Sequence, residues 1–229
     1  MIAIIGAMDE EIALLLTKIE VQSDEMIANS RFIQGKLEGK EVVLLKSGIG
    51  KVNAAMATTI LHERYQPTAV INTGSAGGLD TSLSIGDIVI SDRVVHHDVD
   101  VTAFDYQYGQ IPSMPLYFES DQNLINIVEK TIQSINQVNC KQGLIATGDS
   151  FIQKPEAVQK IREQFPDVIA AEMEAVAIAQ VCHQYQTPFV VIRALSDIAG
   201  KESAQSFDQF IDQAARHAAE LIIKVVKQL

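Results

Sequence analysis

The sequence predicts an α/β fold in which a mostly parallel sheet is covered by helices on both faces. Short runs of β-branched and aliphatic residues alternate with segments of helical periodicity along the chain. Several runs, such as VVLL, AVIN and PFVVIRA, are continuously apolar, which is typical of strands buried on both faces. No linker, repeat or low-complexity segment divides the 229 residues, so we expect one domain over residues 1–229.

The predicted elements follow one another in a regular order. Residues 2–5 (IAII) form the first strand, and DEEIALLLTKI forms the first helix. A strand over 41–48 precedes a helix over KVNAAMATTILHERY, and a strand over 69–74 precedes a glycine-rich turn. A longer, half-exposed strand is expected over 86–98. The last three strands are QGLIATGD, VIAAEME and PFVVIRALSD.

The C-terminal segment has the clearest helical pattern. Apolar residues recur at i, i+3, i+4 and i+7 spacing from Phe207 to Leu229. Ser206 with Gln209 predicts a capping box at the start of this helix.

Charge and composition exclude several classes of function. The chain has 29 acidic and 18 basic residues, a net charge of -11, and its lysines and arginines are dispersed. Binding to nucleic acid or to an anionic membrane is therefore not expected. The N-terminal apolar run is too short for a signal peptide or a membrane span, which points to the cytoplasm. Cys140 and Cys182 lie outside any ligand spacing and are interpreted as inert thiols.

Common motifs for cofactors and metals fail on inspection. GIGKVN lacks the third glycine of a dinucleotide fingerprint, and Val52 stands where a P-loop needs Ser or Thr. In HHDVDVTAFD, Ala103 replaces the glycine of a calcium loop and no glutamate closes it. We therefore interpret His96, His97 and Asp98 as strand and surface residues. No metal and no cofactor is expected.

The residues that follow the predicted strands form the candidate site. Ligands of parallel α/β sheets bind beyond the carboxyl ends of the strands. Small residues at those ends let backbone approach a ligand, and hydroxyls and carboxylates supply chemistry. The strand ends of this chain contribute Met8, Glu11, Ile49, Ser75, Gly77, Phe151, Glu172, Met173, Glu174, Ser196 and Asp197.

Four carboxylates have more than one interpretation. Glu172 and Glu174 lie in the apolar run AAEMEAVAIA, where an unpaired carboxylate is costly. On a continuing strand both would point to one face, whereas at a strand-to-helix junction one serves the site and the other a helix N-terminus or a salt bridge. Glu11 also suits a helix N-terminus, and Asp197 also suits an N-cap.

Two or three acids around one pocket predict cleavage of a glycosidic-type bond. One acid, with a raised pKa, protonates the leaving group, and an ionised one takes a proton from the attacking water. The lack of a metal motif and of a basic phosphate clamp agrees with hydrolysis. The residues by themselves lead to this reaction class.

The chain resembles the bacterial 5′-methylthioadenosine/S-adenosylhomocysteine nucleosidases in seven blocks: IIGAMDEE, KSGIGKVNAA, INTGSAGGLD, VTAFDYQYGQIP, ATGDSFI, AAEMEAVAIAQVC and PFVVIRALSD. The blocks follow the family's order from Ile2 to the final helix. The resemblance implies a purine nucleoside phosphorylase-like fold, a three-layer α/β/α sandwich around a central mixed sheet. It also implies hydrolysis of 5′-methylthioadenosine, S-adenosylhomocysteine and 5′-deoxyadenosine to adenine and the sugar, in methionine salvage and removal of methyl-cycle by-products.

The resemblance assigns a role to each catalytic position. Asp197 would be the general acid that protonates adenine N7, and Glu11 the general base that activates water. Glu174 would accept hydrogen bonds from the ribose hydroxyls and stabilise an oxocarbenium-like transition state. Ser75 and Arg193 would help to hold the water and the ribose.

The remaining site residues are assigned in the same way. Glu172 would position Arg193 or the water network. Phe151 would stack on adenine, Ile152 backbone groups would read its edge, and Met173 would lie over the ribose. Met8, Ile49, Val101 and Phe207 would form the apolar wall for the 5′-thioalkyl group, and Gly77, Ser196 and Ala199 would also contact the substrate.

The resemblance further implies a homodimer. Phe104 and Pro112, in the VTAFDYQYGQIP block, would reach into the site of the neighbouring subunit. Asp105 stands where the family commonly has glycine, which bears on the conformation of this loop, and His96 stands where relatives often have tyrosine.

Two rival functions are weighed against hydrolysis. A phosphorylase of the same fold needs cations for phosphate, and phosphorolytic relatives carry an arginine where this chain has Asn72. Asp9, Glu10 and Glu11 would repel phosphate, so charge favours hydrolysis. A non-catalytic nucleoside-binding protein is the second rival, and the presence of both Asp197 and Glu11 argues against it.

Overall fold

A mixed sheet of ten strands carries the fold in the described residues, which are 1–134, 139–201 and 203–229 of a computed structural model. The strands are β1 (Ile2–Gly6), β2 (Glu20–Ile27), β3 (Ser30–Leu37), β4 (Lys40–Lys46), β5 (Ala69–Gly78), β6 (Ile88–His96), β7 (Phe118–Glu119), β8 (Cys140–Thr147), β9 (Val168–Glu172) and β10 (Phe189–Ile198). The helices are α1 (Asp9–Leu16), α2 (Lys51–Tyr65), α3 (Gln122–Gln133), α4 (Pro155–Gln164), α5 (Ala175–Tyr185) and α6 (Ser203–Gln228), with a 3₁₀ turn η1 (Thr102–Phe104).

The sheet combines a closed part with an open part. Its strand order is β10-β6-β8-β9-β5-β1-β4-β3-β2, with β7 beside β6, and β10 also pairs with β5. Strands β5, β10, β6, β8 and β9 therefore close into a small barrel, while β1, β4, β3 and β2 extend from β5. Strand β1 is parallel to β4 and β5, and β10 is parallel to β5 but antiparallel to β6. The expected mixed sheet is confirmed.

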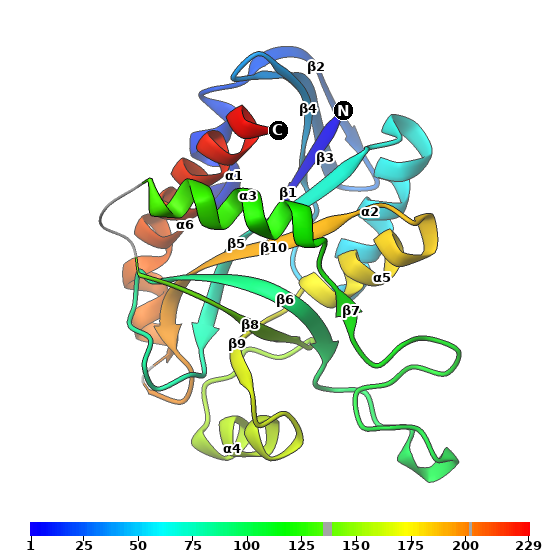
Figure 1. Cartoon of the computed structure of the whole chain (residues 1–229), viewed down its shortest axis with the longest axis vertical. Coiled ribbons are helices and arrows are strands. Elements are labelled where there is room, and N and C mark those ends of the chain that lie inside the picture. The colour runs from blue at the N-terminus through cyan, green and yellow to red at the C-terminus, as the bar shows by residue number, and fades with distance from the viewer. Residues whose placement is uncertain (135–138, 202) are drawn as a thin grey trace.

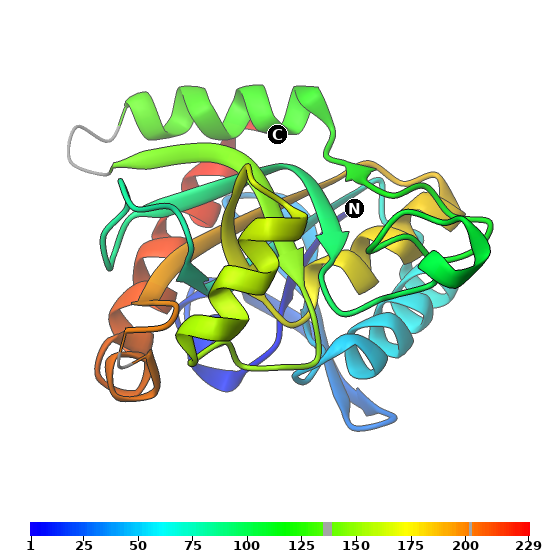
Figure 2. The ribbon, with the colours of Figure 1, turned by 90° about the horizontal axis from the view of Figure 1, so that it is seen from below.

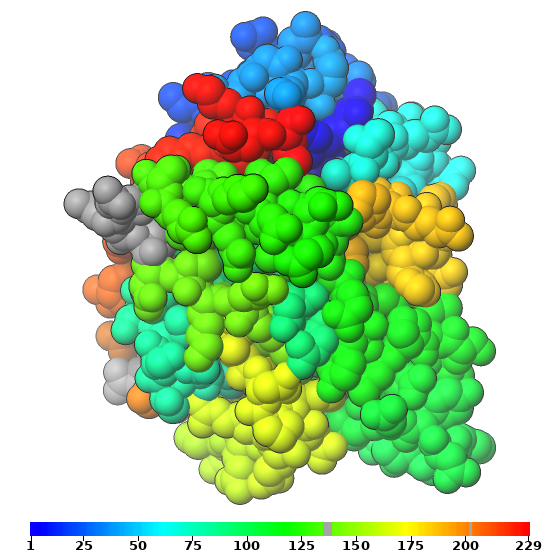
Figure 3. Space-filling model, viewed as in Figure 1, coloured from blue at the N-terminus to red at the C-terminus, as the bar shows by residue number. Residues whose placement is uncertain are grey.

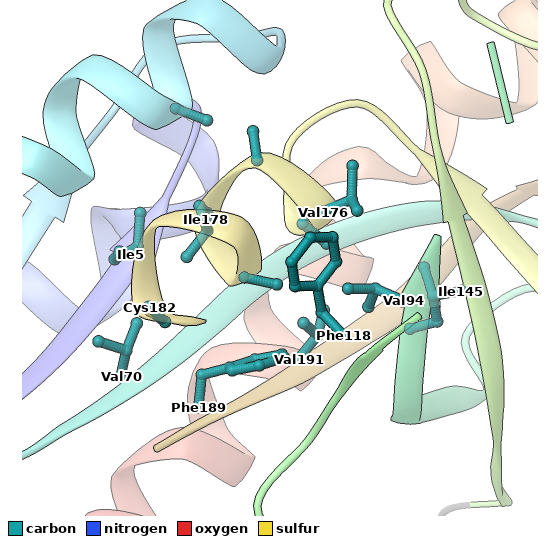
Figure 4. Packing of buried hydrophobic residues seen from close by; sticks show 14 of the residues in the cluster. Ile5, Val70, Val94, Phe118, Ile145, Val176, Ile178, Cys182, Phe189 and Val191 are labelled. Atoms are coloured by element: carbon teal, nitrogen blue, oxygen red, sulfur yellow. The ribbon is translucent and has the colours of Figure 1, made fainter. Parts of the chain in front are cut away.

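Helices cover both faces of the sheet, as the sandwich requires. In Figure 1, α1 and α6 lie on one side of the sheet, and α2 and α5 lie on the other. One apolar core lies under α1, α3 and α6, and a second lies under α2 and α5. Figure 4 shows Val176, Ile178 and Cys182 of α5 beside Val70 and Val191 of the strands. The predicted three layers are confirmed.

Local sequence explains where several helices begin and end. The N-cap Asp121 accepts the Asn123 and Leu124 amides, both at 2.9 Å, at the start of α3. Helix α4 begins with a proline, whose missing N–H is not needed there. This helix lies at one end of the barrel, in front of the other elements in Figure 2. Helix α2 ends at Tyr65, and its C-cap Gln66 is left-handed with φ 46°.

The structure corrects three expectations about the elements. The glycine-rich segment after residue 74 is not a turn: β5 continues to Gly78, because Gly77 and Gly78 pair with both β10 and β9. Strand β6 is mostly buried instead of half exposed, since it lies between β8 and β10. The capping box at Ser206 is wrong, because α6 already begins at Ser203.

The histidine pair is also buried and not on the surface. His96 and His97 are 4% and 8% exposed. His96 Nε2 lies 3.3 Å from Gln180 Oε1 of α5, and His97 packs against Gly148. In the part of the chain that the structure describes, no cluster of His, Cys, Asp and Glu has the geometry of a metal site. No described helix is both long and apolar enough to cross a membrane.

Candidate active site

A cavity of about 340 Å³ opens where β1, β5, β9 and β10 end. Its wall is apolar except for a group of carboxylates and hydroxyls. The lining residues are Ala7, Met8, Glu11, Ile49, Ser75, Ala76, Gly77, Phe151, Ala171, Glu172, Met173, Glu174, Ser196, Asp197, Ala204, Phe207 and Asp208. The strand ends thus converge on one site, as the parallel pairing of β1, β5 and β10 requires.

Glu11 is held at the floor of the cavity by short-range hydrogen bonds. It lies in the first turn of α1, and its Oε2 accepts the Ala7 amide at 2.7 Å and the Met8 amide at 3.3 Å. Its Oε1 accepts the Ser75 amide at 2.9 Å and the Ser75 hydroxyl at 3.2 Å. Both carboxylate oxygens therefore act as acceptors, which is how an ionised carboxylate bonds.

Gly74 leaves the space that this arrangement occupies. Its φ is 147°, and a Cβ built on it would lie 2.5 Å from Glu11 Oε1 and would also clash with Arg193. Because Gly74 pairs with Arg193 across β5 and β10, the guanidinium crosses the sheet where no side chain blocks it. The glycine thus allows the acid and the arginine to approach each other.

Arg193 lies under the cavity wall and contacts all three glutamates. Its Nη2 is 2.5 Å from Glu172 Oε2 and 3.5 Å from Glu174 Oε2, and its Nη1 is 3.9 Å from Glu11 Oε1. Although burial lowers the pKa of Arg193, the three carboxylates outweigh burial and raise it above its usual value. Asn72 Oδ1 accepts a further hydrogen bond from Nη2 at 2.8 Å. The arginine is therefore charged, and both of its Nη atoms are paired, whereas its Nε has no hydrogen-bond partner among the described residues.

Glu172 and Glu174 separate at a strand-to-helix junction. Glu172 ends β9, and its Oε2 accepts the Glu174 amide at 2.9 Å and the Ala175 amide at 2.8 Å at the start of α5. Its Oε1 accepts the Thr147 hydroxyl. The prediction that one of the two acids serves a helix N-terminus and a salt bridge is confirmed for Glu172.

Glu174 is the less well-paired acid. Its Oε1 accepts the Gly50 amide at 2.9 Å. Burial, followed by the charge of Glu172, raises the pKa of Glu174 well above its usual range, and Arg193 and the Gly50 amide only partly offset this. Its carboxyl group reaches the cavity, where a ligand hydroxyl can supply the donors that the protein does not.

Asp197 lines the cavity from β10 and is not an N-cap. It is 1% exposed, and its Oδ1 accepts the Ser196 hydroxyl at 3.0 Å. Burial raises the pKa of Asp197, although the hydroxyls of Ser196 and Ser203 act in the other direction. A Cβ on Gly77 would lie 3.1 Å from Asp197 Oδ2, so the glycine leaves room for this carboxyl. Such an acid is suited to donate a proton.

Aromatic side chains close the outer part of the cavity. Phe151, from the loop after β8, and Phe207, from the first turns of α6, meet edge to face with ring centroids 5.7 Å apart. Phe151 remains 42% exposed, so its ring can stack on a planar ligand. Ile152 lies beside Phe151 at a smaller adjoining cavity, which Gly77 and Asp197 also line.

The structure brings most of the predicted site residues to the cavity wall, and the remaining ones lie behind it or elsewhere. Arg193 is beneath the wall, and Ala199 is 7% exposed behind Gly77. Val101, Phe104 and Pro112 do not line the cavity of their own chain. They lie in the loop between β6 and β7, which extends from the barrel in Figures 1 and 3.

Several lining residues were missed by the sequence analysis. Ala204 and Asp208 belong to the first turns of α6, at positions i−3 and i+1 of Phe207. Helical periodicity through Phe207 would have found Ala204. Ala7 and Ala76 belong to the strand ends that the sequence analysis considered, but they were given no role, and Ala171 directly precedes the predicted Glu172.

Comparison with known proteins identifies the family. The sequence profile of the phosphorylase superfamily matches residues 1–227. A 5′-methylthioadenosine/S-adenosylhomocysteine nucleosidase of Bacillus subtilis (strain 168) is 57% identical over 228 residues, which are 100% of this chain and 99% of the relative. The corresponding nucleosidase of Bacillus cereus (strain AH187) is 59% identical with the same coverage. This chain belongs to the 5′-methylthioadenosine/S-adenosylhomocysteine nucleosidase family.

Solved structures of this nucleosidase family have the same fold. The nucleosidase from Neisseria meningitidis in complex with methylthio-immucillin-A has a TM-score of 0.98 and 47% identity, covering 100% of this chain and 99% of that one. The nucleosidase from Colwellia psychrerythraea 34H in complex with adenine has a TM-score of 0.97 and 48% identity, covering 100% and 95%. The purine nucleoside phosphorylase-like fold that the sequence predicted is confirmed.

Proposed function

We propose that this chain hydrolyses the N-glycosidic bond of 5′-methylthioadenosine and S-adenosylhomocysteine, and also of 5′-deoxyadenosine, to release adenine and the 5′-substituted ribose. The observation that carries the proposal is the placement of three buried acids, Asp197, Glu11 and Glu174, on the wall of one cavity. Asp197 lies beside Phe151, whereas Glu11 and Glu174 surround Arg193. A purine near Phe151 thus meets one acid while its ribose meets the others.

Asp197 acts as the general acid that protonates the leaving group. A purine anion is a poor leaving group, and protonation at adenine N7 allows it to depart as a neutral base. Asp197 is nearly fully buried with a raised pKa, which favours the protonated carboxyl that a general acid needs. Phe151 stacks on the base, and backbone groups of Ile152 read its edge.

Glu11 acts as the general base that activates the attacking water. Ser75 and Arg193 lie next to its carboxylate and hold the water with it. Glu11 takes one proton from the water as the new C–O bond forms at the anomeric carbon and the C–N bond breaks. Glu172 keeps Arg193 in place through their short ion pair.

The ribose is bound by Glu174, with Met173 against its face. Hydrogen bonds from ribose hydroxyls to a buried carboxylate strengthen as positive charge develops on the sugar in an oxocarbenium-like transition state. Met8, Ile49 and Phe207 provide an apolar wall for the 5′-substituent. Gly77, Ser196 and Ala199 complete the contacts around the base.

Charge in the cavity favours water over phosphate as the nucleophile. None of the described residues lining the cavity is a lysine or an arginine. Arg193 is already paired with carboxylates, and Asn72, at the position where phosphorolytic relatives carry arginine, accepts a hydrogen bond from it. A phosphate dianion would have to displace these acids from Arg193, the only cation that pairs with them among the described residues.

A homodimer would complete the site. Phe104 is 75% exposed in the projecting loop, and Pro112 is also exposed. Exposed apolar side chains of this size suit an interface, and Val52 and Tyr185 add to the apolar surface on α2 and α5. We assign Val101, Phe104 and Pro112 to the partner's cavity. Asp105 has φ 63°, the left-handed conformation that glycine favours. The loop therefore keeps this turn although an aspartate stands where the family commonly has glycine.

An end-point assay tests the proposed function. The purified chain is incubated with 5′-methylthioadenosine in phosphate-free buffer and again with added phosphate. Adenine and free methylthioribose in both buffers are expected. Release that requires phosphate and yields a sugar 1-phosphate would identify a phosphorylase, and no adenine in either buffer would favour the nucleoside-binding alternative. A single domain over 1–229, a cytoplasmic location and roles in methionine salvage and methyl-cycle by-product removal stay predictions.

A further inference from the structure

A ring of hydrogen bonds lies next to the carboxylate cavity and joins three distant segments. Asp149 Oδ1, in the loop after β8, accepts the backbone amide of Lys51 at 2.8 Å. Asp98 Oδ1, after β6, accepts the Lys51 ammonium at 2.6 Å. Asp98 Oδ2 in turn accepts the Asp149 amide at 3.0 Å. The ring fastens the start of α2 to the loops that follow β6 and β8.

This ring fixes the residue that hydrogen-bonds Glu174. Gly50 precedes Lys51, and its amide donates to Glu174 Oε1 at 2.9 Å. Gly50 has φ 92°, and a Cβ on it would lie 3.0 Å from Asp149 Oδ1, so the carboxylate is packed against this glycine. Asp149 binds the peptide group on the C-terminal side of Gly50 and thereby restrains the direction of the Gly50 amide.

The ring also links the two ends of the substrate cavity. Asp149 lies two residues before Phe151, which lines the part of the cavity near Asp197. Ile49, on the other side of Gly50, also lines the cavity. The hydrogen bond between Lys51 and Asp149 therefore joins the segment that contains Ile49 to the segment that contains Phe151.

We propose that Asp149 is a positioning residue for the reaction: it holds the turn at Gly50 so that the backbone amide donates to the Glu174 carboxylate. The inference rests on the proposed function, because it assigns Asp149 to the ribose-binding acid of that reaction. Asp149 does not line the cavity itself, and it acts through Gly50 and Lys51.

The groups that face Glu174 determine the expected pH effect. Glu172 and Glu11 disfavour its ionised form, while Arg193 and the Gly50 amide favour it. Loss of the Gly50 hydrogen bond therefore raises the pKa of Glu174 further. Because Glu174 binds ribose as a carboxylate, the ascending limb of the kcat/KM profile moves to higher pH.

The test compares Asp149→Ala with Asp149→Asn. In D149A we expect kcat/KM for 5′-methylthioadenosine to fall roughly tenfold near neutral pH and the ascending limb to move up by roughly one pH unit. In D149N both effects shrink, since the amide oxygen can still accept the Lys51 N–H. Asp24→Ala is the matched control: it removes a carboxylate that pairs with Arg31 in the β2–β3 hairpin, and its profile should equal the wild type.

Asp98→Ala is a second variant for the case that D149A does not fold. It removes the acceptor for the Asp149 amide and for the Lys51 ammonium, so a smaller shift in the same direction is expected. An active wild type with unmoved pH profiles in the folded variants overturns the positioning role and leaves the proposed function intact. A wild type that releases no adenine overturns the proposed function, and the inference with it.

Discussion

Glu172 and Arg193 form an ion pair inside the protein, with Oε2 and Nη2 2.5 Å apart and side chains 3% and 1% exposed. Glu172 also accepts two amides at the start of α5, so the same carboxylate joins β9, α5 and β10. The pair places the guanidinium within reach of Glu11 and Glu174. The position of Arg193 under the cavity wall thus depends on Glu172.

Glu172→Ala should therefore be both unstable and inactive. Removing one partner of a buried ion pair leaves the other charge uncompensated, which costs roughly 3–5 kcal/mol. Urea unfolding of the variant should give a free energy of unfolding lower by about that amount, and turnover should be lost. Glu172→Gln, which keeps an oxygen acceptor for the α5 amides, should be milder in stability. An alanine variant as stable as the wild type would contradict the pair's structural importance.

The lack of a side chain at residue 74 is a second requirement of this arrangement. Gly74→Ala would place a Cβ 2.5 Å from Glu11 Oε1 at a φ of 147°. We expect the displaced Glu11 and Arg193 to lower kcat at least a hundredfold, since misplacement of about 1 Å can have that effect. Gly39→Ala is the control, because Gly39 also has positive φ, 76°, but a Cβ there would meet no atom within 4 Å. G39A should melt at a lower temperature than the wild type because of backbone strain, and its kcat and KM should be unchanged.

The sequence predicted the site better than it predicted the sheet. Strand-end residues are local, and parallel strands bring them together whatever the strand order, so Glu11 and Asp197 could be placed in one pocket. The junction at Glu172 and Glu174 was also foreseen, because strand parity must break where a helix begins. The residues near the junction could not show which of the two acids serves the cavity. That depends on the hydrogen bonds to Arg193 and Gly50, which are remote in the chain.

Elements that depend on tertiary contacts escaped the prediction. Strand β2 is exposed and mostly polar and is stabilised by pairing with β3, so its pattern has no buried face. The glycine-rich end of β5 is a strand because two neighbours pair with it. The role of Asp149 depends on Asp98 and Lys51, which lie 51 and 98 residues away in the chain. No short window of sequence contains these relationships.

Asp197→Asn should fold and lose nearly all turnover, because an amide cannot deliver a proton to adenine N7. Since the pKa of Asp197 is raised in the folded state, its ionised form opposes folding, and this loss of stability grows as the pH rises through the folded pKa. Asparagine does not ionise and so avoids this loss of stability. At pH 7 the variant should therefore melt at the wild-type temperature or above it. The difference should vanish below the usual pKa of 3.8. Near-wild-type turnover in this variant would remove the general-acid assignment.

The dimer prediction can be tested by complementation between two defective variants. If Phe104 of one subunit completes the cavity of its partner, Phe104→Ala weakens every site in its own homodimer by raising KM, whereas D197N disables every site in its homodimer. A mixed dimer has one restored site: the chain with intact Asp197 receives Phe104 from the D197N chain. Random exchange of equal amounts should give roughly a quarter of the sites wild-type kinetics, as two-fold symmetry requires. A mixture no more active at low substrate than the average of its parents, although sedimentation demonstrates exchange, would mean that Phe104 serves only its own chain.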